Sequence, residues 1–349
     1  MTGPAAAPYD ALLVLSFGGP EGPDDVRPFL DNVTRGRAVP AERLAAVAEH
    51  YLAFGGVSPI NAANRALVAD VRAELGRHGI TLPVFWGNRN WHPFVTDAMR
   101  EMAGAGVRRA LVFCTSAYAS YSSCRQYLED LERARQEVGD SAPRVEKLRH
   151  YFDHPGFIAP QIDAVRAALD GRGAERRATT RLVFTAHSIP LTMATVSGRG
   201  GDTYVRQLLA ASDLIARAAA PDLGWELAFQ SRSGPGSVPW LEPDIGNRLR
   251  DLVVDGVRDV VVVPVGFVSD HVEVVWDLDH EAAGIAAELD LGFARTPTPG
   301  GDPRFVAMVR ELLDERLDPS VEVRALSDLG PSGADCSTTC CLPDRPTVS

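Results

Sequence analysis

The chain has 349 residues, of which 45% are hydrophobic and 23% are charged, and its formal net charge is -11. This length and composition are typical of a globular protein with two domains. The negative charge disfavours a nucleic-acid partner, because phosphates need a basic protein face. The N-terminal sequence lacks the basic and apolar segments of a signal peptide, and no apolar run is long enough to cross a membrane. We therefore expect a cytoplasmic protein without an integral membrane segment, and nothing in the sequence requires more than a monomer.

Apolar runs alternate with amphipathic segments in the first half of the chain. Strands are predicted at residues 10–15, 82–87 and 110–115. Helices are predicted at residues 23–33, 41–54, 61–78 and 94–105. The glycine-rich loop 55–59 is expected to present the Ser58 hydroxyl at its tip. After the third strand, a polar and aromatic loop from Tyr118 to Tyr127 leads into a charged helix, so the alternation predicts βαβ units and a parallel sheet.

The second half of the chain repeats this order without a convincing repetition of sequence. Helices are predicted at residues 156–169, 204–220 and 302–317, and strands at residues 181–185, 226–230 and 260–263. The loop 231–240 is rich in proline and glycine and is expected to line a cleft. We therefore expect an α/β fold with parallel sheets, divided into domains 1–155 and 156–317 and a tail, 318–349.

A row of carboxylates follows the buried strand at residues 260–263. A helix is predicted to begin after Ser269-Asp270, and on it Glu273, Asp277 and Glu281 recur at every fourth residue, along one face. Like charges at this spacing oppose helix formation, so the row indicates a bound cation or another function. Asp270 and Glu273 also have the spacing of a capping box, so a purely structural role for Glu273 stays open.

A histidine, His187, directly follows the predicted strand at residues 181–185. If this strand lies beside the strand at 260–263, His187 faces His271 and the carboxylate row. Imidazole and carboxylate ligands suit a divalent metal such as iron, and they can also accept protons. The chain lacks the HExxH spacing and the nucleophile elbow of the hydrolases. A single histidine is nevertheless more often structural than functional.

Five cysteines, an odd number, disfavour a disulfide framework. Cys336, Cys340 and Cys341 crowd into a polar tail that cannot bury them as a core. Three such thiolates need a fourth ligand to complete a zinc site or an iron–sulfur cluster, and Cys124 or Cys114 could supply it. The alternative is a frayed tail with incidental thiols.

Several segments resemble signature segments of the ferrochelatase family. The two main ones are Thr185-Ala-His187-Ser-Ile-Pro190 and Val263-Pro-Val-Gly-Phe-Val-Ser-Asp-His271-Val-Glu273-Val. The resemblance covers residues 10–315 and implies two Rossmann-like domains with a porphyrin cleft between them, where ferrous iron is inserted into a porphyrin. It implies that His187 binds the metal and accepts pyrrole protons, that Glu273 is its partner, and that Asp277 and Glu281 form a relay.

Within this family, the sequence is most similar to the bacterial branch that uses coproporphyrin III. The resemblance implies porphyrin-binding positions at Phe17, Arg35, Arg37, Tyr51, Ser58 and Tyr127. Some relatives have a tyrosine at the position of Phe17, whose phenolate can ligate the product iron. Phe17 has no such oxygen, so we expect no ligation from this position.

The resemblance also implies a [2Fe–2S] cluster, which some members of the family carry. Its expected ligands are Cys124, Cys336, Cys340 and Cys341, whereas Cys114 is expected in the core. The competing functions are insertion of iron into protoporphyrin IX, a cobalt chelatase of the same fold, and a non-catalytic carrier of haem or metal.

Overall fold

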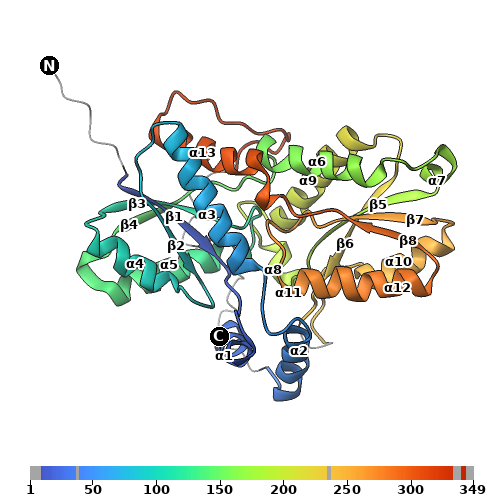
Figure 1. Cartoon of the computed structure of the whole chain (residues 1–349), viewed down its shortest axis with the longest axis horizontal. Coiled ribbons are helices and arrows are strands. Elements are labelled where there is room, and N and C mark those ends of the chain that lie inside the picture. The colour runs from blue at the N-terminus through green and yellow to red at the C-terminus, as the bar shows by residue number, and fades with distance from the viewer. Residues whose placement is uncertain (1–8, 37–38, 234–236, 333–338, 343–349) are drawn as a thin grey trace, which may run out of the picture. The chain divides into compact units, whose positions relative to one another are not determined.

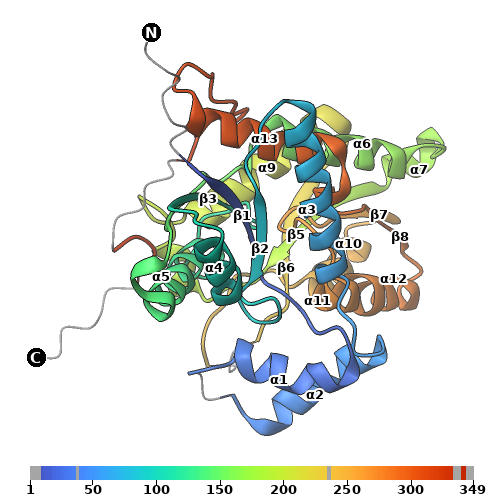
Figure 2. The ribbon, with the colours of Figure 1, turned by 60° about the vertical axis from the view of Figure 1, so that its left-hand side comes forward.

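The computed structural model describes residues 9–36, 39–233, 237–332 and 339–342. The chain divides into two compact units. The first comprises the described residues of Met1–Ser116, Gln126–Arg149 and Phe305–Val323, and the second those of Ala117–Arg125, His150–Arg304 and Arg324–Ser349. Both units combine a parallel sheet with covering helices, so the expected α/β class is confirmed (Figures 1 and 2).

The first unit contains a four-stranded parallel sheet with the order β2-β1-β3-β4. Its strands are β1 (Ala11–Ser16), β2 (Val84–Asn88), β3 (Arg109–Cys114) and β4 (Arg144–Lys147). All residues of β1 are buried, as expected for a continuous apolar run in the middle of a parallel sheet. One face, with Leu13 and Val112, packs against α4 (Val95–Gly104) and α5 (Gln126–Val138).

The opposite face of this sheet is covered by helices from distant parts of the chain. The ring of Phe305, in α13 (Pro303–Leu317), contacts that of Phe113 in β3, with centroids 6.1 Å apart. Helix α3 (Ile60–Arg77) contacts β2. Helices α1 (Pro23–Val33) and α2 (Ala41–Ala53) pack against each other and lie beyond the end of the strands (Figure 2).

The second unit contains a parallel sheet with the order β6-β5-β7-β8. Its strands are β5 (Thr180–His187), β6 (Trp225–Gln230), β7 (Asp259–Val263) and β8 (Gly292–Arg295). In both units the first strand lies between the second and the third, so the two halves share one topology. Helices α6 (Pro155–Leu169) and α9 (Thr203–Ala219) lie on one side of the sheet, and α10 (Ile245–Val254) and α12 (Ala283–Glu288) on the other (Figure 1).

Two strands and two α-helices, all short, were not predicted from the sequence. They are β4, β8, α7 (Ala174–Ala178) and α8 (Leu191–Thr195). Strands β4 and β8 lie at sheet edges, and most of their residues are only partly buried or exposed. Edge strands can carry polar residues, so they lack the apolar alternation that marks a central strand. None of the helices in the described ranges combines the length and apolarity that a membrane crossing requires.

Candidate metal and porphyrin site

The carboxyl ends of β5 and β7 lie side by side in the second unit, as the sequence suggested. His187 is the last residue of β5. After β7, the backbone N–H of Gly266 donates to the carbonyl of Thr185, at 3.0 Å. A Cβ atom on Gly266 would lie 2.6 Å from that of Ala186, so only glycine allows the turn after β7 to approach β5 this closely. The turn therefore leads the chain directly past His187.

The acidic segment does not begin with the predicted capping box. The N-cap residue is His271, whose Nδ1 accepts a hydrogen bond from the backbone N–H of Val274, at 3.3 Å. Asp270 instead forms an ion pair with Arg295, at 3.0 Å. The capping-box interpretation was wrong because a tertiary partner removes Asp270 from the cap. The Glu273 carboxylate is therefore not held in a capping box.

The segment is also not one continuous α-helix, as the sequence predicted. A short turn, α11 (Val272–Val274), passes into the π-helix η3 (Val275–Ala282) and then into α12. In η3 the Trp276 indole N–H donates to Glu281, five residues later, at 2.8 Å. π-Helices are rare and are often found at functional sites. The spacing of four residues between the carboxylates could not predict this one, because the same spacing is expected in an α-helix. Glu281, at the far end of the row, is exposed.

His187 and Glu273 face each other across the strand ends. His187 Nε2 lies 3.7 Å from a carboxylate oxygen of Glu273, and both side chains are more than a third exposed. On the other side of the ring, Nδ1 lies 2.5 Å from the carbonyl oxygen of Ser188. A carbonyl can only accept, so Nδ1 carries the proton and Nε2 keeps its lone pair for a metal or a proton. Two ligands of one tetrahedral metal lie about 3.4 Å apart, close to the observed separation.

Asp277 lies one turn beyond Glu273, and its carboxylate accepts hydrogen bonds from two residues that the sequence reasoning did not single out. The Ser231 hydroxyl and the Gln230 side-chain amide, the latter at 3.3 Å, both donate to it. Burial raises the pKa of Asp277 to about 7, the Ser231 hydrogen bond opposes this shift, and the charges of Glu273 and Glu281 increase it. Asp277 can therefore gain or lose a proton near neutral pH.

Replacing Asp277 with asparagine is expected to weaken the pH dependence of stability. The folded state favours the protonated carboxyl, because its pKa of about 7 lies above the ordinary value of 3.8. This contribution to the free energy of unfolding is complete below about pH 4, is lost as the pH rises to about 7, and amounts to at most about 4 kcal/mol. Urea unfolding at several pH values measures it, with Asp251→Asn, an exposed carboxylate of α10, as the control. Equal slopes for Asp277→Asn and the parent chain would contradict the assignment.

His271 stays neutral beside these carboxylates. Burial lowers the pKa of its imidazole, and the neighbouring Glu273 raises it by less. Because Nδ1 accepts the cap hydrogen bond, the neutral ring carries its proton on Nε2. This histidine thus fixes the start of the helix that bears Glu273.

Three of the expected porphyrin positions belong to a linked set of rings in the first unit. The half-buried ring of Phe17 contacts that of Phe29, with centroids 6.3 Å apart, and Phe29 contacts the buried Tyr51, at 5.5 Å. The guanidinium carbon of Arg89 lies 4.6 Å from the ring centre of Tyr127 and 5.9 Å from that of Phe17. Burial raises the pKa of Tyr127 to about 12, although Arg89 opposes the shift.

Arg89 was not identified from the sequence, although it directly follows the carboxyl end of β2. Its side chain is 5% exposed and forms an ion pair with Asp130 at 2.5 Å. A buried arginine between two porphyrin-binding candidates provides a fixed positive charge. Its position after a strand was the only signal that could have indicated it.

The remaining expected porphyrin positions differ in their exposure. Ser58 is 3% exposed, so its hydroxyl is not presented at a loop tip as predicted, because the loop folds against Gly19. Arg35 is exposed and donates to the side chain of Asn32. Arg37 lies outside the described residues.

The cysteines fall into two groups. Cys114 is buried in the core of the first unit, as predicted. Cys124, Cys340 and Cys341 are buried in the second unit, where the sulfur atoms of Cys340 and Cys341 lie 3.7 Å apart. The backbone N–H of Gly198 donates to the sulfur of Cys341, at 3.1 Å. Cys336 lies outside the described residues.

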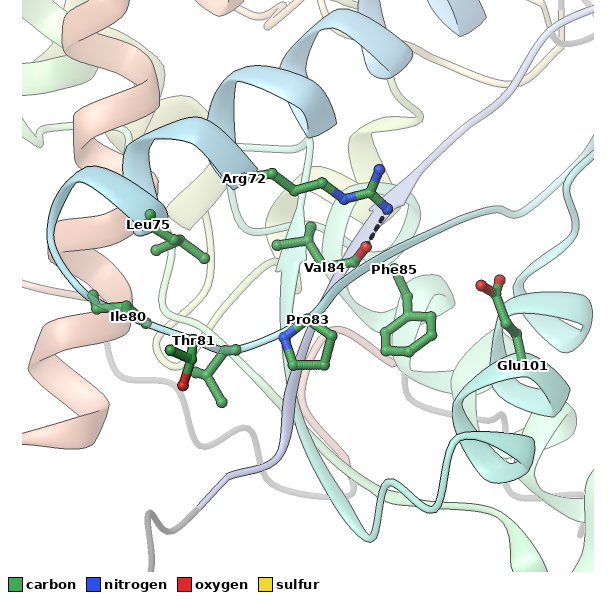
Figure 3. A pocket seen from close by; sticks show the side chains of 10 residues that line it. Arg72, Leu75, Ile80, Thr81, Pro83, Val84, Phe85 and Glu101 are labelled. Atoms are coloured by element: carbon green, nitrogen blue, oxygen red, sulfur yellow. Dashed lines mark hydrogen bonds between the residues drawn. The ribbon is translucent and has the colours of Figure 1, made fainter.

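A separate pocket in the first unit does not coincide with these candidates. It has a volume of 390 Å³ and lies at the amino end of β2, with Arg72, Ile80, Phe85 and Glu101 in its lining (Figure 3). Arg72 donates to the carbonyl of Val84, at 2.5 Å. Ligands of open α/β sheets bind at the carboxyl ends of the strands. This pocket lies at the opposite end of β2 and is therefore not taken as the functional site.

Solved structures of low sequence identity share the fold of the chain. SirB from Bacillus subtilis, solved with Fe3+, has a TM-score of 0.51 at 12% identity, with 88% of this chain and 98% of SirB covered. A sirohydrochlorin chelatase SirB from Bacillus subtilis subspecies spizizenii, in complex with cobalt, has a TM-score of 0.51 at 10% identity, with 89% and 96% covered. At these identities the similarity concerns the fold alone, and it agrees with the predicted chelatase-like architecture. The porphyrin cleft, the monomer and the cytoplasmic location stay predictions.

Sequence relatives and a family model identify the family of the chain, which the similarity of fold does not. The coproporphyrin III ferrochelatase of Nocardia farcinica is 56% identical over 343 residues, which cover 96% of this chain and 97% of the relative. That of Streptomyces coelicolor is 52% identical over 352 residues, which cover 96% and 94%. The family model of ferrochelatase matches residues 9–317. The predicted resemblance is thereby confirmed, and the chain belongs to the ferrochelatase family of iron-inserting enzymes.

Proposed function

We propose that this enzyme inserts ferrous iron into coproporphyrin III, with His187 and Glu273 as the residues that bind the iron and accept the pyrrole protons. The observation that carries this proposal is the pair itself, in which His187 Nε2 lies 3.7 Å from Glu273 at the ends of two neighbouring strands. The names of the relatives from Nocardia farcinica and Streptomyces coelicolor support coproporphyrin III as the substrate.

The small number of protein ligands at this site suits a metal that is bound only briefly before it enters the porphyrin. Within the described part of the chain, no group of three or more His, Cys, Asp or Glu side chains is placed to hold a metal ion. His187 and Glu273 thus offer two ligands, and the pyrrole nitrogens of the substrate provide the others. A site with few protein ligands releases iron to the macrocycle more readily than a closed site does.

Two protons leave the porphyrin when the iron enters. The lone pair on His187 Nε2 can accept the first, because the Ser188 carbonyl holds the ring proton on Nδ1. Glu273 and Asp277 follow in the carboxylate row, and the pKa of Asp277, raised to about 7 by burial, suits proton uptake near neutral pH. We propose that Glu281, the exposed end of the row, exchanges protons with water.

The porphyrin periphery would be held by the first unit, through Phe17, Arg35, Arg37, Tyr51, Ser58 and Tyr127. An exposed arginine such as Arg35 can bind a propionate through two parallel hydrogen bonds. Coproporphyrin III carries four propionates, so it gains more from such contacts than protoporphyrin IX does. Phe17 contributes its ring face, since it has no oxygen that could ligate the product iron.

Substrate competition tests this assignment. With ferrous iron and equal amounts of the two porphyrins, coproporphyrin III is expected to be metallated at least about tenfold faster, which corresponds to about 1.4 kcal/mol of additional binding. Visible absorption of the anaerobic mixture measures both products. Preference for protoporphyrin IX would contradict the substrate, preference for cobalt over iron would indicate a cobalt chelatase, and binding without metallation would indicate a carrier.

We further propose that Cys124, Cys336, Cys340 and Cys341 ligate a [2Fe–2S] cluster. Two of these residues suit such a group, since two thiolates on one tetrahedral metal lie about 3.8 Å apart and the sulfur atoms of Cys340 and Cys341 are 3.7 Å apart. The described part of the chain does not bring Cys124 into one group with them. The Gly198 N–H bonded to Cys341 is the kind of donor that stabilises a cluster thiolate. When bound, the cluster would supply a one-electron redox centre.

A further inference from the structure

Two buried tyrosines in the second unit donate hydrogen bonds to the chain next to the proposed iron ligands. The hydroxyl of Tyr204 donates to the backbone carbonyl of His187, at 2.9 Å, and that of Tyr118 donates to the carbonyl of Val265, at 2.8 Å. Both side chains are at least 95% buried, and burial raises the pKa of each. Both hydroxyls therefore stay protonated and remain donors. The two strand ends that define the site are each held by a phenol.

The two tyrosines also contact each other. Their rings meet edge to face, with centroids 6.2 Å apart. The ring of Phe157 lies 6.2 Å from that of Tyr118. The backbone N–H of Ala119 donates to the side chain of Gln207 in α9, at 2.8 Å, which fixes the segment of Tyr118 to the helix of Tyr204. A displacement of one tyrosine is therefore resisted by the other, since packed interiors deform little.

The loop that precedes Tyr204 connects this pair to Cys341. The backbone N–H of Gly198 donates to the sulfur of Cys341, at 3.1 Å. In the adjacent residue, the Ser197 hydroxyl accepts from the backbone N–H of Tyr204, at 2.9 Å. Ser197 is fully buried. The Cys341 sulfur is thus connected to the backbone of His187 by three hydrogen bonds. They run from Gly198 to Cys341, from the Tyr204 backbone to Ser197, and from the Tyr204 hydroxyl to His187.

Tyr118 has a corresponding connection to Cys124. The hydroxyl of Ser123 donates to the backbone carbonyl of Tyr118, at 2.8 Å, and Cys124 follows in the π-helix η1 (Tyr121–Arg125). The segments that carry two of the proposed cluster ligands are therefore each tied to one tyrosine of the pair.

We infer that Tyr118 and Tyr204 are positioning residues that hold the iron-binding strand ends and transmit changes at the cysteine segments to His187. Ligation of a metal by the Cys341 sulfur changes the charge and the position of the atom that accepts from the Gly198 N–H, and Ser197 passes that displacement to Tyr204. The inference rests on the proposed role of His187 as an iron ligand. Its test therefore includes a measurement that does not require iron insertion.

The test compares Cys341→Ser in two backgrounds, using the full-length protein as purified. The measured quantity is the position of the His187 ring-proton signals in two-dimensional NMR spectra, assigned by their loss in His187→Gln. Cys341→Ser is expected to move these signals in the parent chain and to leave them in place in Tyr204→Phe. A double-mutant comparison of this kind isolates coupling from a local effect of either substitution. Equal movement in both backgrounds, or none in the parent chain, overturns the inference.

Tyr9→Phe is the matched control. Tyr9 is also 5% exposed, and its hydroxyl donates to Glu146 of the first unit, at 2.7 Å, and accepts from Arg316, at 2.9 Å. In that background the response of His187 to Cys341→Ser is expected to equal that of the parent chain. If Tyr204→Phe does not fold, Ser197→Ala interrupts the same connection at its other end and is expected to abolish the response.

Kinetics provide the second measurement. Tyr204→Phe is expected to raise the KM for ferrous iron about fivefold and to leave the KM for the porphyrin unchanged, because only the histidine loses a hydrogen bond. An unchanged KM for iron overturns the positioning role. A chain that inserts no iron but shows the expected NMR pattern contradicts the proposed function and leaves the connection intact.

Discussion

Glu273→Gln is expected to lower the rate of iron insertion about 10³-fold while coproporphyrin III still binds. Glutamine keeps the shape of the side chain but has no negative charge, so it neither accepts a pyrrole proton nor balances the charge of iron. The carboxylate that it replaces lies 3.7 Å from His187 Nε2. Single-turnover absorption with ferrous iron measures the rate, and quenching of the porphyrin fluorescence measures binding. The large effect on rate reflects the small number of protein ligands at this site.

Glu288→Gln provides the control for this experiment. Glu288 is an exposed carboxylate at the end of α12, in the same helical segment, and it belongs to none of the proposed sets. Its substitution is expected to change the rate less than about twofold, because screening by water weakens exposed charges. A Glu273→Gln protein that retained the parent rate would exclude the proposed proton acceptor. Loss of porphyrin binding together with the rate would assign Glu273 to the binding of the porphyrin instead.

Cys340→Ser and Cys341→Ser are each expected to remove the bound cluster. The parent protein, purified without oxygen, is expected to be brown and to contain about two iron atoms per chain, and each variant to be colourless with iron near zero, because an Fe–S cluster of this kind needs four ligands. Iron and sulfide analysis together with the visible spectrum measure this loss. The free energy of unfolding is expected to fall as well, since metal binding stabilises the folded state.

Cys114→Ala separates this effect from a general loss of thiols. Cys114 is 5% exposed and packs in the core of the first unit, so its removal is expected to reduce stability by about 1 kcal/mol while the visible spectrum persists. A colourless parent protein that contains zinc would replace the cluster with a zinc site. A brown Cys341→Ser protein would exclude Cys341 as a ligand.

The helix that bears the carboxylate row shows where prediction from sequence stopped. The sequence predicted a helical segment with Glu273, Asp277 and Glu281 at every fourth residue, because their spacing is a local property. It did not reveal the π-helix η3 or the cap formed by His271. The cap depends on a tertiary neighbour, since Arg295 of β8 holds Asp270 away from it. The pKa of Asp277 also depends on tertiary contacts. Burial of the carboxyl raises it, and the hydrogen bond from Ser231, a residue distant in the sequence, opposes the shift.

The candidate porphyrin-binding residues also include features that the sequence predicted and features that only the tertiary structure revealed. The sequence alone indicated Phe17 and Tyr127 through the resemblance, but it did not indicate that Arg89 lies near both rings. It also placed the Ser58 hydroxyl at a loop tip, whereas the close approach of Gly19 buries it. Contacts between residues far apart in the chain are not encoded in any short pattern, so packing alone decided them.

By itself, the sequence determined the α/β class, the parallel strands, the family and the meeting of His187 with Glu273. The fold class and the strands follow from apolar periodicity and from the turns that end buried strands. The family and the pairing of His187 with Glu273 follow from the resemblance of two segments to those of known ferrochelatases. The tertiary structure decided which ring nitrogen of His187 carries the proton, because the Ser188 carbonyl accepts from Nδ1. It also decided that the Tyr204 hydroxyl donates to the backbone carbonyl of His187. The physical reason is that protonation and positioning depend on the few ångströms around each group, and folding brings those neighbours together from separate parts of the chain.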